Sequence, residues 1–189
     1  MRKILLTLFL SFLFMMSYSQ FYKNIISSPK GFSDSLNVIV KEYALNYRGI
    51  QGELLEMQNG VEIYKAFASL PGAQSASIYR YQSKVDTTAS WQAIMCSGVS
   101  FKEASKIYRN LYNAVKKSKI NFNEPSAGGF YGEMQAPVES MRFIQSDLRS
   151  SSTGKIYQKL VVTIELTGEF EDWEVKISIS HKRDDSKYL

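Results

Sequence analysis

Cysteine and histidine are almost missing from this sequence of 189 residues, which has one of each, Cys96 and His181. A single cysteine excludes an intramolecular disulfide, and a zinc site built from cysteine and histidine would lack ligands. The two residues form the only available thiol–imidazole pair. Cys96, however, follows Ile94 and Met95 in an apolar segment, where a free cysteine behaves as a small apolar residue. We therefore interpret Cys96 as a core residue and His181 as the exposed end of a strand.

The common catalytic signatures are also missing. The sequence contains no glycine-rich phosphate loop, no HExxH and no GxSxG, which removes the commonest signatures of exported hydrolases. Acidic residues gather at positions 169–174, but Phe170 and Trp173 interrupt them, and the run does not match the twelve-residue calcium loop. We interpret this cluster as the solvated end of a hairpin. The sequence predicts no catalytic residue, no metal site and no cofactor.

Residues 1–19 show the three-part pattern of a secretory signal peptide. A positive start, Arg2 and Lys3, precedes the apolar residues 4–16, and small side chains follow at positions 17 and 19. A helix over the apolar run would span roughly 20 Å, which is short of the bilayer core of about 30 Å. No cysteine follows the run, so a lipid anchor has no attachment point. We expect cleavage after Ser19, no transmembrane anchor thereafter, and a periplasmic or secreted protein.

The charge balance argues against nucleic acid as a partner. Cleavage would remove two basic and no acidic residues, so the net charge would fall from +5 to +3. A surplus this small is not typical of a nucleic-acid-binding domain. With 44% hydrophobic and 22% charged residues the composition is that of a globular protein. We expect a lead-in at 20–30, one domain at 31–183 and a polar tail at 184–189.

Two segments have the apolar spacing of amphipathic helices. In residues 33–47 the apolar residues recur three and four positions apart, Ser33 or Asp34 is a candidate cap, and Gly49 is a candidate end. A second helix starts at Ser100, which forms a capping box with Glu103, and fades near residues 117–119. The expected buried stripes are Phe32, Leu36, Ile39, Val40, Tyr43 and Tyr47 in the first helix, and Ala104, Ile107, Tyr108, Leu111 and Val115 in the second.

The strand signals are strongest near the C-terminus. Residues 157–167 and 173–181 alternate cleanly between apolar and polar side chains, so each strand has one face in water. Leu160 and Ile177 belong to the apolar sets, and Thr163, Glu165, Lys176 and Ser178 belong to the polar sets. Weaker strand signals cover residues 61–69, 76–82, 90–97 and 141–149, whereas 52–57 is ambiguous and 121–140 has no clear period.

These elements predict an α+β fold, with an antiparallel sheet of about five or six strands and two helices packed on one face. The order of helix, three strands, helix, three strands also suggests a duplicated helix-plus-three-strand unit. No repeat at the residue level supports the duplication.

Several stretches together resemble a family of small uncharacterised bacterial exported proteins. The resemblance covers most of the expected mature chain and rests on core and turn residues. It implies one exported domain, no assigned activity and no site residue. The stretches are Gly52-Glu53-Leu54, Pro71-Gly72-Ala73, Trp91, the helix at 101–112, and the closing strands at 160–166 and 173–179.

We predict an exported, non-catalytic binding or interaction domain. Its contact surface would be the polar sheet face together with residues 121–140. The partner would be a protein, a glycan or a small ligand of the cell envelope. Tyr79, Tyr81, Trp91 and Trp173 are candidates for an aromatic platform, although aromatic residues in strands more often lie in the core. The expected contact residues are Thr163, Glu165, Lys176, Ser178, Tyr131, Lys102, Lys106 and Arg109.

Two alternatives remain open at the level of sequence. A periplasmic enzyme with carboxylate-based chemistry would need a pocket with two converging carboxylates. A carrier of a small apolar ligand would need a buried apolar cavity between helices and sheet.

Overall fold

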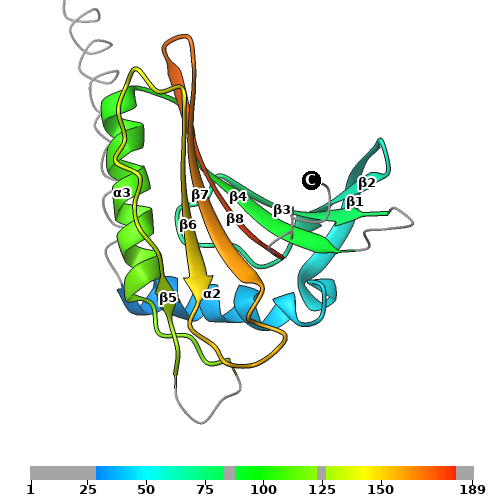
Figure 1. Ribbon diagram of the computed structural model, residues 1–189. Coiled ribbons are helices and arrows are strands. Elements are labelled where there is room, and N and C mark those ends of the chain that lie inside the picture. Colours follow the sequence, from blue (N-terminus) through cyan, green and yellow to red (C-terminus); the bar gives the residue numbers. More distant parts are fainter. Residues whose placement is uncertain (1–28, 83–87, 123–126, 182–189) are drawn as a thin grey trace, which may run out of the picture.

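The computed structural model describes residues 29–82, 88–122 and 127–181 (Figure 1). The expected signal peptide and the expected tail at 184–189 lie outside these ranges. The described part contains two α-helices, one short 3-10 helix and one eight-stranded sheet. The elements are α2 (Pro29–Tyr43), η1 (Arg48–Ile50), β1 (Gln51–Gln58), β2 (Val61–Ala66), β3 (Ser75–Tyr81), β4 (Ala89–Val99), α3 (Phe101–Lys117), β5 (Phe130–Tyr131), β6 (Phe143–Ser150), β7 (Leu160–Glu169) and β8 (Asp172–His181).

Helix α3 follows the predicted pattern. Ser100 is its N-cap, and the Ser100 hydroxyl accepts a hydrogen bond of 3.4 Å from the backbone N–H of Glu103. The predicted stripe is buried, and Lys116 and Lys117 lie in the last turn, where positive charge suits the helix dipole.

Helix α2 has the predicted buried stripe but different ends. It begins at Pro29, where the fixed backbone angle of proline suits a first turn, so the predicted start and its caps at Ser33 or Asp34 were wrong. It ends at Tyr43 and not at residue 47, because Asn46 and Tyr47 adopt left-handed backbone angles (φ 55° and 60°). Tyr47 is nevertheless buried, since the turn directs it into the core.

The sheet is antiparallel throughout, in the order β1-β2-β3-β4-β8-β7-β6-β5. The prediction of five or six strands was too low, because it did not include β1 and β5. The order is symmetric about its centre, where β4 and β8 are neighbours. Counted from either edge, four strands follow one another in sequence order, β1 to β4 from one edge and β5 to β8 from the other. Each half is therefore one helix followed by four strands, where we expected three.

The alternation of β7 and β8 agrees with the prediction. Leu160 and Ile177 are fully buried, whereas Thr163 and Lys176 are only partly covered. Both helices lie on the apolar side of the curved sheet, where α3 packs against β4, β7 and β8 (Figure 1). We call the opposite, polar side the open face.

Candidate functional site

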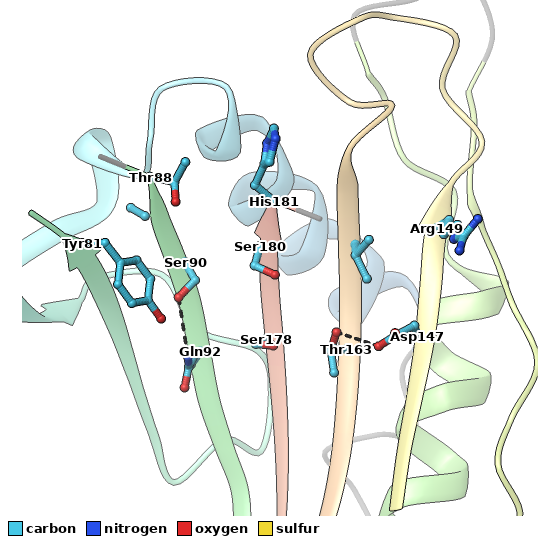
Figure 2. A pocket seen from close by; sticks show the side chains of 12 residues that line it. Tyr81, Thr88, Ser90, Gln92, Asp147, Arg149, Thr163, Ser178, Ser180 and His181 are labelled. Atoms are coloured by element: carbon cyan, nitrogen blue, oxygen red, sulfur yellow. Dashed lines mark hydrogen bonds between the residues drawn. The ribbon is translucent and has the colours of Figure 1, made fainter. Parts of the chain in front are cut away.

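A shallow hollow of about 360 Å³ lies on the open face (Figure 2). Five neighbouring strands, β3, β4, β8, β7 and β6, contribute its walls, and Thr88 next to β4 also lines it. Most of its lining is polar. The lining residues are Tyr81, Thr88, Ala89, Ser90, Gln92, Asp147, Arg149, Val161, Thr163, Ser178, Ser180 and His181.

Strand register arranges these side chains in rows that cross the strands. One row runs through Ser77, Gln92, Ser178, Thr163 and Asp147, each opposite the next on the adjacent strand. Because residues opposite each other in neighbouring strands point to the same face, the whole row lies on the open face, and its members other than Ser77 line the hollow.

A second row lies two residues further along each strand, on the same face. Tyr79 is opposite Ser90 on one side of the sheet centre, and Arg149 is opposite both Val161 and Tyr131 on the other. Ser180, opposite Val161, completes the row between the two groups.

Asp147 is the lining carboxylate, and two neighbours already hold one of its oxygens. Its Oδ1 accepts hydrogen bonds from the Thr163 hydroxyl at 2.8 Å and from the Gln145 amide at 3.0 Å (Figure 2 shows the first). These bonds fix the carboxylate on the face, and Oδ2 has no protein donor within the described part of the chain.

Three lining side chains have no partner within the part of the chain that the structure describes. The hydroxyls of Ser178 and Ser180 and the guanidinium of Arg149 form no hydrogen bond or ion pair there. Arg149 is exposed and Ser178 and Ser180 are partly covered, so a ligand can reach all three. Binding sites are commonly lined by polar groups that are free to form hydrogen bonds with a ligand.

Charge is balanced at the centre of the face. Lys176 and Glu165 form a 2.8 Å ion pair on adjacent strands. Partial burial acts to lower the pKa of Lys176, but the hydrogen bond to Glu165 and the nearby Glu165 and Glu174 carboxylates raise the pKa overall, with a smaller contribution from Tyr79. Lys176 and Glu165 therefore neutralise each other, whereas Arg149 forms no ion pair within the described part of the chain.

The four aromatic residues considered for a platform lie on different faces of the sheet. Trp91 and Trp173 are buried in the core, as residues of strands commonly are. Tyr79 and Tyr81 are partly covered and lie on the open face, and Tyr81 lines the hollow. The aromatic contribution to the site therefore comes from tyrosine.

The expected contact residues fall into two groups. Thr163 and Ser178 line the hollow, Glu165 and Lys176 lie beside it, and Tyr131 is 55% exposed next to Arg149. By contrast, the side chains of Lys102, Lys106 and Arg109 are exposed on α3. That helix covers the other side of the sheet, so these three residues are not part of the hollow.

The described residues of 121–140, namely 121–122 and 127–140, contribute less to the open face than expected. The segment includes strand β5, and only Tyr131 of that strand reaches the face. Further along, the Gly132 carbonyl accepts a hydrogen bond from Tyr112 of α3, and the Gln135 N–H donates to the buried Ser146. This part of the segment therefore closes the edge between α3 and β6.

Cys96 and His181 lie on neighbouring strands but at opposite ends. Cys96 is opposite Val175, so His181 is six residues further along β8, roughly 20 Å away. Burial raises the pKa of the Cys96 thiol to about 11. His181 instead contacts the Tyr43 hydroxyl through Nδ1 at 2.9 Å. The geometry supports no thiol–imidazole pair.

Sequence reasoning missed several site residues, namely Ser90, Gln92, Asp147 and Arg149. Their signal is present but weak. In β6 the buried Ile144 and Leu148 alternate with Gln145, Asp147 and Arg149, which is the same pattern that identified β7.

Comparison of the chain with models of protein families, with curated proteins and with solved structures gave no match. Within the described ranges, no helix combines the length and the apolar character needed to cross a membrane.

Proposed function

We propose that this protein is an exported, non-catalytic binding domain whose open face holds a polar ligand. The observation that carries the proposal is the hollow across five strands, in which Ser178, Ser180 and Arg149 have hydrogen-bonding groups without a partner in the described ranges. A rigid sheet presents these groups in a fixed arrangement, which lowers the entropic cost of binding.

The lining favours binding over the two alternatives. Glycosidase-type catalysis requires two carboxylates, and among the lining residues that the structure describes Asp147 is the single carboxylate. Glu165, its nearest counterpart on the face, is held by Lys176. An apolar ligand would leave the lining hydroxyls without partners, which costs free energy.

A panel of small ligands, together with a variant whose hollow is filled by a larger side chain, tests the binding proposal. Cellotriose, trigalacturonate, trialanine and adenosine monophosphate are titrated into the isotope-labelled protein, and amide chemical shifts are followed by NMR. We expect at least one probe to shift amides of β4, β7 and β8. Ser178→Tyr should abolish the effect by filling the hollow.

The matched control is Asn113→Tyr, which adds a ring on the exposed side of α3 and should bind normally. The binding proposal fails if no probe at millimolar concentration shifts the open face, or if Ser178→Tyr binds as well as the wild type.

Export forms the second part of the proposal. It is supported by the signal pattern of residues 1–19 and by the resemblance to exported bacterial proteins. The full chain expressed in a Gram-negative host should appear in the periplasmic fraction with Gln20 as its first residue, by N-terminal sequencing. Cytoplasmic protein that retains residues 1–19 would contradict export.

A further inference from the structure

We infer that the ligand of the open face is an oligosaccharide with carboxylate substituents, and that Arg149 binds one of these carboxylates. The inference rests on the proposed function and specifies its ligand class. Three features of the open face carry it: the hydroxyl lining of the hollow, the Arg149 guanidinium, which has no partner within the described ranges, and tyrosines at both ends of a cross-strand row.

The hollow offers side chains and not backbone to its ligand. It lies in the interior of the sheet, where each strand pairs on both sides, so a peptide cannot join it by strand addition, which needs a free edge. The lining has little apolar character to receive peptide side chains, since Ala89 and Val161 are its aliphatic members and both are buried.

Hydroxyl groups are the commonest functional group of the lining. A hydroxyl both donates and accepts hydrogen bonds, and a sugar ring presents the same type of group at several positions. A saccharide can therefore pair with this lining without leaving polar groups unsatisfied. The hydroxyl-bearing lining residues are Tyr81, Thr88, Ser90, Thr163, Ser178 and Ser180.

Arg149 adds a preference for negative charge. Its guanidinium is exposed and has no partner within the described chain. Neighbouring Asp147 does not form an ion pair with it, and the Asp147 Oδ1 accepts hydrogen bonds from Thr163 and Gln145. A guanidinium fork matches a carboxylate with two parallel hydrogen bonds, whereas the remaining Asp147 oxygen suits a sugar hydroxyl.

The site is elongated across the strands. Tyr79 on β3 and Tyr131 on β5 lie near the two ends of the row that contains Ser90, Ser180 and Arg149. Five strand spacings separate β3 from β5, which is roughly 24 Å before the curvature of the sheet is considered. Tyrosine rings provide flat apolar contact area with a polar tip, which suits the faces of successive sugar rings. An oligomer fits this row better than a single sugar.

Two probes that differ only in charge test the inference. Pentagalacturonate carries a carboxylate on every ring, and its methyl ester is the neutral analogue. Calorimetric titration of the full chain should show at least tenfold tighter binding of the acid. Arg149→Gln should remove the preference for the acid over the ester, whereas Arg109→Gln, the same change at an exposed position on α3, should keep the preference.

Saccharide carboxylates also occur on the lactyl groups of cell-wall glycan strands, so a peptide-free strand of this kind forms a second arm. Binding of either acidic glycan that is lost in Arg149→Gln supports the inference, and the relative affinities identify the source. Equal binding of acid and ester, or an unchanged preference in Arg149→Gln, overturns it.

The two proposals fail in different ways. If trialanine or the nucleotide shifts the open face while no saccharide does, the saccharide inference is overturned and the binding proposal survives. If nothing shifts the open face, both are wrong.

Discussion

Tyr47 has an unfavourable backbone conformation, but its side-chain hydroxyl forms a buried hydrogen bond. Its φ of 60° lies in the left-handed region, which costs a residue with a Cβ atom about 1–2 kcal/mol. In return its buried hydroxyl donates a 2.7 Å hydrogen bond to the Ile179 carbonyl of β8. Burial, together with the nearby Tyr43, raises the pKa of Tyr47 well above its usual value, so this donor keeps its proton.

Removing this hydroxyl should be costly. We expect Tyr47→Phe to lower the free energy of unfolding by about 1–3 kcal/mol, because the Ile179 carbonyl loses a buried donor. Urea denaturation followed by circular dichroism measures the change. Tyr131→Phe, at an exposed hydroxyl, should leave the midpoint within error. Equal stability of both variants would contradict the assigned role of Tyr47.

Cys96 should be inert in the folded protein. Its side chain is fully buried and burial raises its pKa to about 11, so the reactive thiolate is scarce at neutral pH. A thiol reagent such as DTNB at pH 8 should label the native protein at least a hundredfold more slowly than the urea-unfolded protein. Fast labelling under native conditions would mean that β4 opens readily.

At the level of elements, success from sequence depended on whether one face of a segment is buried. β7, β8 and both helices bury one side against the core, so their periodicity is readable, and the polar half of that pattern located Thr163 and Ser178 in the site. β1 was ambiguous because Glu53 to Gln58 are exposed on both faces of an edge strand, which leaves no alternation. β5 has two residues and is too short to show a period.

Residues that depend on pairing partners were beyond sequence reasoning. Arg149 belongs to the site because β6 pairs with β7 in one register, and a shift of one residue would turn it into the core. Lys102 was assigned to the contact surface for a different reason. The sequence shows that its helix face is in water, and exposure alone does not place a residue at the hollow.

The contact between α3 and residues 132–135 gives an element-scale prediction. The Tyr108 and Ser146 hydroxyls lie 2.5 Å apart, and the Gln135 N–H donates to Ser146 at 2.8 Å. Ser146→Ala removes the acceptor, so the Gln135 amide should exchange with solvent about tenfold faster. Hydrogen-exchange mass spectrometry resolves the segment, and Ser140→Ala at an exposed position should exchange normally. Faster exchange throughout α3 would instead indicate general unfolding.

Across the whole molecule, several buried groups hold their protons more tightly than they would in the unfolded chain. Burial raises the pKa of Cys96 from 9.0 to about 11 and that of Tyr43 from 10.0 to about 12, and it also raises the pKa of Tyr108. In this pH range the unfolded chain therefore binds fewer protons than the folded protein, and stability falls as pH rises.

These groups should cause stability to fall between pH 9 and 12, because their contribution is fully present just below pH 9 and is lost as the pH rises through their raised pKa values. Each titrating group contributes at most about 1.4 kcal/mol per pH unit. Urea denaturation at a series of pH values measures the profile, and Cys96→Ala should make the slope between pH 9 and 11 shallower. Constant stability up to pH 11 would contradict the burial of these groups.

The symmetric strand order raises the question of whether the two halves fold independently. They share one core, because β4 and β8 pair along the centre and α3 packs against both strands. Each half carries one buried tryptophan, Trp91 in β4 and Trp173 in β8. Tryptophan fluorescence can therefore follow each half separately.

We expect the protein to unfold as one unit. In Trp173→Phe the fluorescence reports on the first half, and in Trp91→Phe it reports on the second. Within each variant the fluorescence midpoint in urea should coincide with the midpoint of far-ultraviolet circular dichroism, even if the substitution lowers stability. Separated midpoints in either variant would show that the halves are two folding units. The hollow would then lie across a junction between them and would lose the rigidity on which its proposed selectivity depends.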